Sequence, residues 1–251
     1  MRDFEDSTLW RISAFERVRL ETGTSGFARL GPATLLPTTL LAELRQIQWD
    51  EVEGDTLEVI AACMRHHEPA LLYLRHEELV WPVTLFPTQM LYHSPRDMAQ
   101  ASKQGLADLR VLDTEPPGVR PPGHWMFERV AQAEHYRPLA PLLWAVALHG
   151  PRSRLLTEIG GTAAYRALKN PADEGLVAPG ALGAAAQHLR RESASLRDIA
   201  KWPGMSVDRA SRLLNALYLA TGLMVTRSHP AARSEPGAVD RFLGRGGKRR
   251  K

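Results

Sequence analysis

Residues 115–124 read EPPGVRPPGH, with four prolines and two glycines in ten positions. Proline fixes φ and has no amide N–H, so neither a helix nor the interior of a sheet is expected to run through this segment. A second break, NPADEGLVAPG, covers residues 170–180. The predicted organisation is an α+β module at 1–114, a Pro-rich linker at 115–124, a helical connector at 125–169, and a C-terminal part from 181 onward.

The composition of the 251-residue chain narrows the class of protein. Charged residues make up 24% and hydrophobic residues 44%, as in an ordinary globular protein rather than a disordered or fibrous one. A single cysteine excludes an internal disulfide framework and a Cys-rich zinc module. The longest apolar stretch, 139–148, is about half of a membrane span, and the acidic start MRDFEDSTLW does not resemble a signal peptide. We therefore expect a cytoplasmic protein with no membrane contact.

Charge is distributed unevenly along the chain. Residues 1–120 hold 12 Lys and Arg against 18 Asp and Glu, whereas residues 181–251 hold 14 against 5. A basic C-terminal end favours contact with nucleic acid or another anionic surface. Two alternatives remain at this point: the basic end contacts the acidic front half of the same protein, or it only keeps the chain soluble.

The front module mixes helix and strand patterns. Asp55 is the expected N-cap of a helix. Pro82 and Pro87 predict that the strand containing them is an edge or bulged strand. The expected elements are a bulged strand at 8–20, helices at 37–47 and 55–67, strands at 70–75 and 79–92, and a helix from Ser94 or Pro95 to Leu109.

The order of helix, β-hairpin and short helix, in TLEVIAACMRHHEPALLYL and VWPVTLFPTQMLYHSP, resembles the PATAN-type signalling domains of bacterial regulators. The resemblance covers about 40 residues and contains no diagnostic motif. Those domains usually have a glycine or small-residue turn where this chain has Phe86-Pro87-Thr88. The resemblance implies a signal-transduction adaptor that works through protein–protein contacts, with residues 1–114 sensing or binding the partner.

The connector has one strong helical pattern. Apolar residues recur at helical spacing in 139–147, and Gly150-Pro151 ends the pattern. Apolar residues continue to Ile159, where Gly160-Gly161 interrupts them. We expect these residues to pack as a bridge between the front module and the C-terminal part.

The C-terminal part contains the most specific pattern. An alanine-rich helix is predicted at 181–191, followed by a helix that Ser195 caps, the tight turn WPGM, and a third helix that Ser206 caps. The third helix has a buried stripe at Ala210, Leu213, Leu214 and Leu217. A strand is expected at 223–227, and SHPAAR then turns a wing.

The residues SLRDIAKWPGMSVDRASRLLNALYLATGLMVTR resemble the winged-helix/helix-turn-helix superfamily, with the module at 181–233 and a basic, disordered tail at 234–251. The resemblance implies a bacterial transcription regulator that binds DNA. Members of such a fold also bind proteins, and this alternative stays open.

In the DNA interpretation the third helix enters the major groove. Arg209 and Arg212 would pair with guanine or phosphate, and Asn215 would reach adenine. Asp208 on the same helix supports the alternative of a solvated face with local ion pairs. The full predicted contact set is Arg197, Lys201, Arg209, Ser211, Arg212, Asn215, Arg227, Arg233, Lys248, Arg249, Arg250 and Lys251.

Catalytic motifs are not found in the sequence, and we expect a non-enzymatic protein with no cofactor and no metal site. Cys63 and His67 lie four residues apart on a predicted helix, where a Cys–His nucleophile is conceivable. Neither the spacing nor a third ligand matches a known site pattern. Cys63 is better interpreted as a small buried thiol on the apolar side of that helix.

Overall fold

The computed structural model describes residues 9–22, 36–50, 55–101, 103–229 and 231. The fold contains helices and two antiparallel sheets, which confirms the predicted α+β class. The predicted tail at 234–251 lies outside the described residues. In the ranges that the structure describes, no helix combines the length and the apolar character that crossing a bilayer requires.

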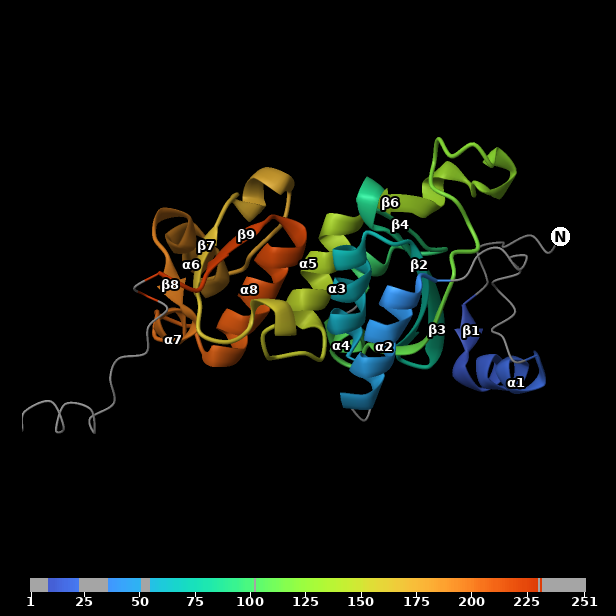
Figure 1. Ribbon diagram of the computed structural model, residues 1–251, viewed down its shortest axis with the longest axis horizontal. Helices are drawn as coiled ribbons and strands as arrows, with labels where there is room; N and C mark the ends of the chain where they lie inside the picture. Colours follow the sequence, from blue (N-terminus) through green and yellow to red (C-terminus); the bar gives the residue numbers. More distant parts are fainter. Residues whose placement is uncertain (1–8, 23–35, 51–54, 102, 230, 232–251) are drawn as a thin grey trace, which may run out of the picture.

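The elements follow one another along most of the described chain. The strands are β1 (Trp10–Arg11), β2 (Ala70–His76), β3 (Leu79–Phe86), β4 (Leu91–His93), β5 (Arg110–Glu115), β6 (Tyr136–Pro138), β7 (Ala164–Ala167), β8 (Ala194–Ser195) and β9 (Leu223–Thr226). The α-helices are α1 (Ile12–Thr22), α2 (Thr38–Asp50), α3 (Thr56–His66), α4 (Lys103–Ala107), α5 (Leu139–His149), α6 (Ala181–Arg191), α7 (Leu196–Ile199) and α8 (Val207–Ala220). Short 3-10 helices are η1 (Pro87–Gln89), η2 (Met98–Gln100), η3 (Phe127–Arg129), η4 (Ala133–His135), η5 (Thr157–Ile159) and η6 (Pro171–Glu174). The larger sheet and the smaller sheet lie toward opposite ends of the long axis, with α5 between them (Figure 1).

The larger sheet has the order β5-β2-β3-β4-β6, with β1 also beside β3. β3 therefore lies inside the sheet, and its register with β2 runs without a shift from Leu79 to Leu85, so the prediction of an edge or bulged strand is wrong. Its side opposite β2 pairs with β1 at Leu79 and Val80 and with β4 from Thr84 to Phe86. Pro82 falls in the gap between these two pairings, where a missing N–H costs no ladder hydrogen bond. Pro87 ends β3, so the predicted strand at 79–92 is two strands with η1 between them.

The first described segment is mostly helical, and the strand predicted over 8–20 is wrong beyond β1. Ile12 and Phe15 are three residues apart, so the change of phase at Phe15 reflects the period of a helix. The Phe15 side chain is buried, and its ring lies 5.1 Å from that of Tyr73 on β2. α1 thus covers the sheet face that carries Tyr73 and Val80.

The opposite sheet face packs against α3 and α5, and α2 packs on α3. The predicted cap of α3 is confirmed, because Asp55 Oδ1 accepts hydrogen bonds from the amides of Leu57 at 3.1 Å and Glu58 at 3.2 Å. Leu72 and Val83 of the sheet belong to the same buried cluster as apolar residues of α5 and α8. One continuous core therefore joins the front module to the C-terminal part.

Residues 94–115 differ from the single predicted helix. They form η2, the five-residue α4 and then β5, which pairs with β2 at one edge of the larger sheet. The side chain of Asp97 caps η2 by accepting a hydrogen bond from the amide of Ala99 at 3.0 Å. A strand was not expected here, because residues 110–115 carry three charged residues and little apolar alternation.

The Pro-rich segment at 115–124 is not a linker between two folded units. It leaves β5 at one edge of the larger sheet and leads to β6, which pairs with β4 at the other edge. Residues 125–169 are likewise not a purely helical connector, because they contain β6, α5 and β7. Residues 116–135 therefore form a crossover loop that joins β5 to β6 within the sheet, and α5 continues directly from β6.

The smaller sheet has the order β8-β7-β9. The elements α6, α7, α8 and β9 follow one another in the predicted order. The strand that pairs with β9 is β7, which precedes α6 in the chain. The sequence predicted a wing turned by SHPAAR after β9 and assigned no pairing strand before α6. The central position of β7 explains why residues 164–167, which were assigned to the connector, belong to this unit.

His93 on β4 makes stability depend on pH. Its ring lies 5.8 Å from that of His135 and 5.1 Å from that of Tyr136, and burial, followed by the charges of His135 and Arg137, lowers its pKa to about 4. A histidine in the unfolded chain has a pKa of about 6.5. The unfolded state therefore binds the proton first, so we expect the contribution of His93 to stability to be constant above about pH 6.5 and to fall by up to about 3 kcal/mol toward pH 4.

The measurement is urea unfolding at several pH values for the native chain and for His93→Gln. The variant should lose this part of the pH slope between about pH 6.5 and 4 and keep the slope that other groups produce. An identical slope in both proteins would contradict the assignment to His93.

Candidate functional site

α7, α8 and the turn between them form where the sequence predicts them. Ser206 Oγ accepts a hydrogen bond from the amide of Arg209 at 3.2 Å, and Ser195 Oγ accepts one from the amide of Asp198 at 3.3 Å. Both caps are therefore confirmed. Gly204 in the turn has φ of +72°, which suits glycine. The predicted apolar stripe is fully buried at Ala210, Leu213, Leu214 and Leu217.

The opposite side of α8 is buried as well. Ser211, Asn215 and Leu219 lie four residues apart along that side, and their exposed fractions are 1%, 0% and 7%. The helix α5 runs beside α8 and packs against it (Figure 1). Along α8, exposed side chains occur only in the first turn, at Val207, Asp208 and Arg209. α8 is therefore a core helix of the described chain.

The side-chain amide of Asn215 is hydrogen-bonded within the protein. Its Oδ1 accepts a hydrogen bond from the amide of Leu156 at 2.9 Å, and its Nδ2 donates to the carbonyl of Arg154 at 2.9 Å. The predicted contact with adenine is wrong, because the side chain is fully buried and both amide groups are used. The predicted contact by Ser211 is wrong for the same reason of burial.

Arg212 caps the end of α5. Its Nη1 donates to the carbonyl of Leu148 at 3.3 Å, which lies in the last turn of α5 and has no helical partner, and to the carbonyl of Gly150 at 2.5 Å, just after the helix. Burial lowers the pKa of Arg212, while the carboxylate of Asp208 raises it. The guanidinium group is therefore engaged within the protein, which does not fit the predicted pairing with guanine.

The other predicted cations divide into three groups. Arg197, Lys201 and Arg209 are exposed around the turn; Lys201 lies 3.5 Å from Asp198, and Arg209 donates to the carbonyl of Gly204 at 2.6 Å. Arg227 donates to the carbonyls of Gly160 at 2.9 Å and Glu158 at 3.2 Å, so it holds the loop before β7. The predicted contacts Arg233, Lys248, Arg249, Arg250 and Lys251 lie outside the described residues.

Gly150, at the end of α5, has no room for a side chain. A Cβ there would lie 2.3 Å from the carbonyl oxygen of Val146, which is backbone and cannot rotate away. We expect Gly150→Ala to lower the free energy of unfolding by about 2 kcal/mol, because the helix end must shift. Gly160→Ala is the matched control, since its Cβ would meet its nearest atoms at an ordinary 3.4 Å. Equal urea midpoints for the two variants would contradict this prediction.

The loop after α5 carries a buried ion cluster. Arg152 forms ion pairs with Asp55 and, at 2.7 Å, with Glu58, and all three residues are less than 9% exposed. Glu58 Oε1 also accepts hydrogen bonds from the amide of Thr157 at 2.8 Å and from its hydroxyl at 2.7 Å. The start of α3 is thus tied to residues 152–157, the same loop that Asn215 holds from the other side.

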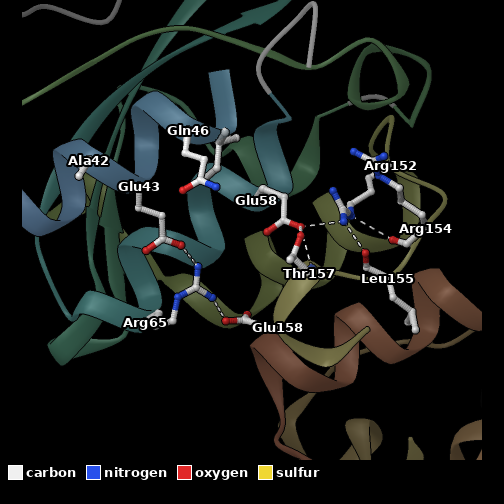
Figure 2. Close-up of a pocket in the computed structure, with 11 residues that line it drawn as sticks. Ala42, Glu43, Gln46, Glu58, Arg65, Arg152, Arg154, Leu155, Thr157 and Glu158 are labelled. Atoms are coloured by element: carbon white, nitrogen blue, oxygen red, sulfur yellow. Dashed lines mark hydrogen bonds and ion pairs between the residues drawn. The ribbon is translucent and has the colours of Figure 1, made fainter. Parts of the chain in front are cut away.

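A pocket of about 770 Å³ opens between α2, α3 and this loop (Figure 2). Arg65 lies between Glu43 and Glu158 and forms an ion pair with each. His66 Nε2 lies 2.6 Å from Glu43 Oε2. Burial raises the pKa of Glu43. The hydrogen bonds from Arg65 and His66 lower this pKa by more, so the pKa lies below its usual value. These charges neutralise one another, so the pocket offers a ligand little unpaired charge.

The Cys63 alternative has no support in the geometry. The thiol is fully buried, and burial raises its pKa to about 12. A nucleophilic cysteine needs the opposite, a thiolate near neutral pH. Within the ranges that the structure describes, no cluster of three or more His, Cys, Asp and Glu is arranged for a metal ion.

The crossover loop presents two aromatic side chains to solvent. Trp125 is 79% exposed and Phe127 is 80% exposed, and we call this pair the aromatic tip. Tyr136 anchors the base of the loop, because its hydroxyl accepts from the amide of Ala131 at 2.9 Å and donates to the carbonyl of Arg120 at 2.5 Å. In Figure 1 the loop projects beyond β4 and β6. The tip is therefore an ordered projection.

Comparisons with protein-family models, curated proteins and solved structures find no match to this chain. The site must therefore be interpreted from its own geometry. Sequence reasoning missed the aromatic tip, although Trp-Met-Phe one residue after the Pro122-Gly123 turn was a usable signal. It also missed Arg152, for which the sequence holds no signal, because its partners are about 95 residues away.

Proposed function

We propose that this chain is a non-enzymatic protein-interaction module of the signal-transduction adaptor type, acting in the cytoplasm. The observation that carries the choice is the burial of α8 on both sides, with Asn215 at 0% exposure. A helix that reads DNA needs a free face, because the major groove is about 12 Å wide and accepts one helix. α5 occupies that face of α8.

The aromatic tip supports contact with a protein. Aromatic residues, above all Trp and Tyr, are enriched among the residues that carry binding energy at interfaces. Large apolar side chains that remain exposed contribute nothing to the core. Because hydrogen bonds of Tyr136 hold the base of the loop, its backbone loses little conformational freedom on binding. The tip is therefore the best candidate for the partner contact.

Two measurements test the proposal. The first is an anisotropy titration of a random DNA duplex at about 50 and 200 mM salt, with the native chain and with Arg197→Ala/Arg209→Ala. The duplex affinities of the two proteins should differ by less than about twofold. A photo-crosslinking residue at Phe127 of the full chain, in cells that express it, should give discrete protein adducts. The control is the same residue at Val177, which is 77% exposed and lies elsewhere.

The proposal is overturned if duplex binding weakens tenfold or more in the double variant, since phosphate contacts by the helix-turn-helix would then operate. Equal adducts from positions 127 and 177 would also overturn it, because the tip would then have no preferred partner.

A further inference from the structure

We propose that the aromatic tip of one copy of this chain docks onto the exposed helix-turn-helix end of a second copy. The inference rests on the proposed function, because it names the partner of the same tip. The receiving surface consists of the half-buried Trp202 and Met205 and the exposed Val207, bordered by Arg197, Lys201 and Arg209. We call it the cationic turn.

Charge selects the class of partner. Within residues 117–135 the exposed charged side chains are the acids Glu128 and Glu134, whereas Arg120 and Arg129 are half-buried. Glu128 is next to Phe127 in the sequence. An anionic lipid surface or a nucleic acid would repel these acids. The tip therefore fits an apolar surface with a cationic border.

The cationic turn has this chemistry. Trp202 and Met205 pack against the core with one side and remain partly accessible on the other, while Val207 is 55% exposed. The ring of His188 lies 4.4 Å from that of Trp202 and supports it. Arg197 has no partner among the residues that the structure describes, so its guanidinium is available to a carboxylate or to an aromatic face.

The two surfaces belong to different copies. The projecting loop and α7 lie toward opposite ends of the long axis, so the tip does not reach the cationic turn of its own chain (Figure 1). A contact between unlike surfaces is head-to-tail, and it continues into a ring or a chain of copies. Two aromatic side chains bury about 300–500 Å², which places this interface among the weak, transient ones.

Sedimentation velocity of the full chain from about 5 to 500 µM tests the inference, since weak interfaces associate in this range. The native chain should show a mass that rises with concentration. Trp125→Ser/Phe127→Ser and Arg197→Glu/Arg209→Glu should each weaken self-association about tenfold or more. Val177→Ser is the control for loss of an exposed apolar side chain and should associate like the native chain. All four substituted positions of the two double variants are exposed, so thermal unfolding should match the native chain.

The mixing experiment is decisive. Each double variant keeps one of the two surfaces, so a 1:1 mixture should form dimers that grow no further. The inference is overturned if the native chain stays monomeric, if the cationic-turn variant associates normally, or if the mixture forms no dimer. A monomeric chain whose position 127 still crosslinks to a different protein would leave the proposed function intact and overturn only this inference.

Discussion

Replacing Arg152 with methionine should lower the free energy of unfolding by about 4 kcal/mol. The substitution keeps most of the side-chain volume and removes the charge between Asp55 and Glu58. Both carboxylates then stay buried without their cation, and breaking a buried pair from one side costs about 3–5 kcal/mol. The carbonyl of Leu155 and the carboxylate of Asp55 also lose Arg152 as a hydrogen-bond donor. The measurement is the urea midpoint, with the slope checked for two-state behaviour.

The matched control is Arg154→Met in the same loop. The Arg154 side chain is 66% exposed and lies 3.9 Å from Asp55, so its loss should cost less than about 1 kcal/mol. Similar losses for the two variants would show that the buried cluster does not hold the loop as described.

Asn215→Leu should lower the free energy of unfolding by about 2–3 kcal/mol. Leucine has a similar size, but it leaves the amide of Leu156 without its side-chain acceptor in a buried place. The carbonyl of Arg154 keeps a donor, because Arg152 Nε also binds it at 3.0 Å. The two positions share this carbonyl, so Arg152→Met and Asn215→Leu should not be additive when combined.

Arg209→Ala is the comparison for Asn215→Leu. Arg209 is exposed on the first turn of the same helix, and its replacement should change stability by less than about 1 kcal/mol. If Asn215→Leu left stability unchanged and removed duplex binding, α8 would be a DNA-reading helix and the proposed function would be wrong.

Local chemistry explains which parts of the fold could be predicted. Asp55 and Ser206 are caps because a side-chain oxygen near a helix start satisfies amides a few residues away, and both partners lie in one short segment. The β2–β3 hairpin follows from apolar runs on either side of a short polar turn. The helical spacing of Ile12 and Phe15 was also local, but it covers only about one helical turn, which does not distinguish a helix from a strand.

Contacts between residues far apart in the sequence explain which features could not be predicted. Asn215 lies off the apolar stripe of its helix, and a polar residue in that position is normally exposed. Its partners are about 60 residues earlier, in a loop whose course depends on α5. β7 could not be assigned for the same reason, because the strand it pairs with is β9. The aromatic tip was visible in the sequence, but its exposure depends on where the crossover loop runs.

The position of β7 also determines when the C-terminal half can form during synthesis. The ribosome releases β7 before α6, α7 and α8, and its partner β9 is made last among the described strands. Until residue 226 emerges, β7 has one free edge, and α5 has no α8 to cover it. Nascent chains therefore expose the apolar helix α5 and the open edge of β7 at the same time. Chaperones bind such exposed segments, and the same segments promote aggregation when synthesis stalls.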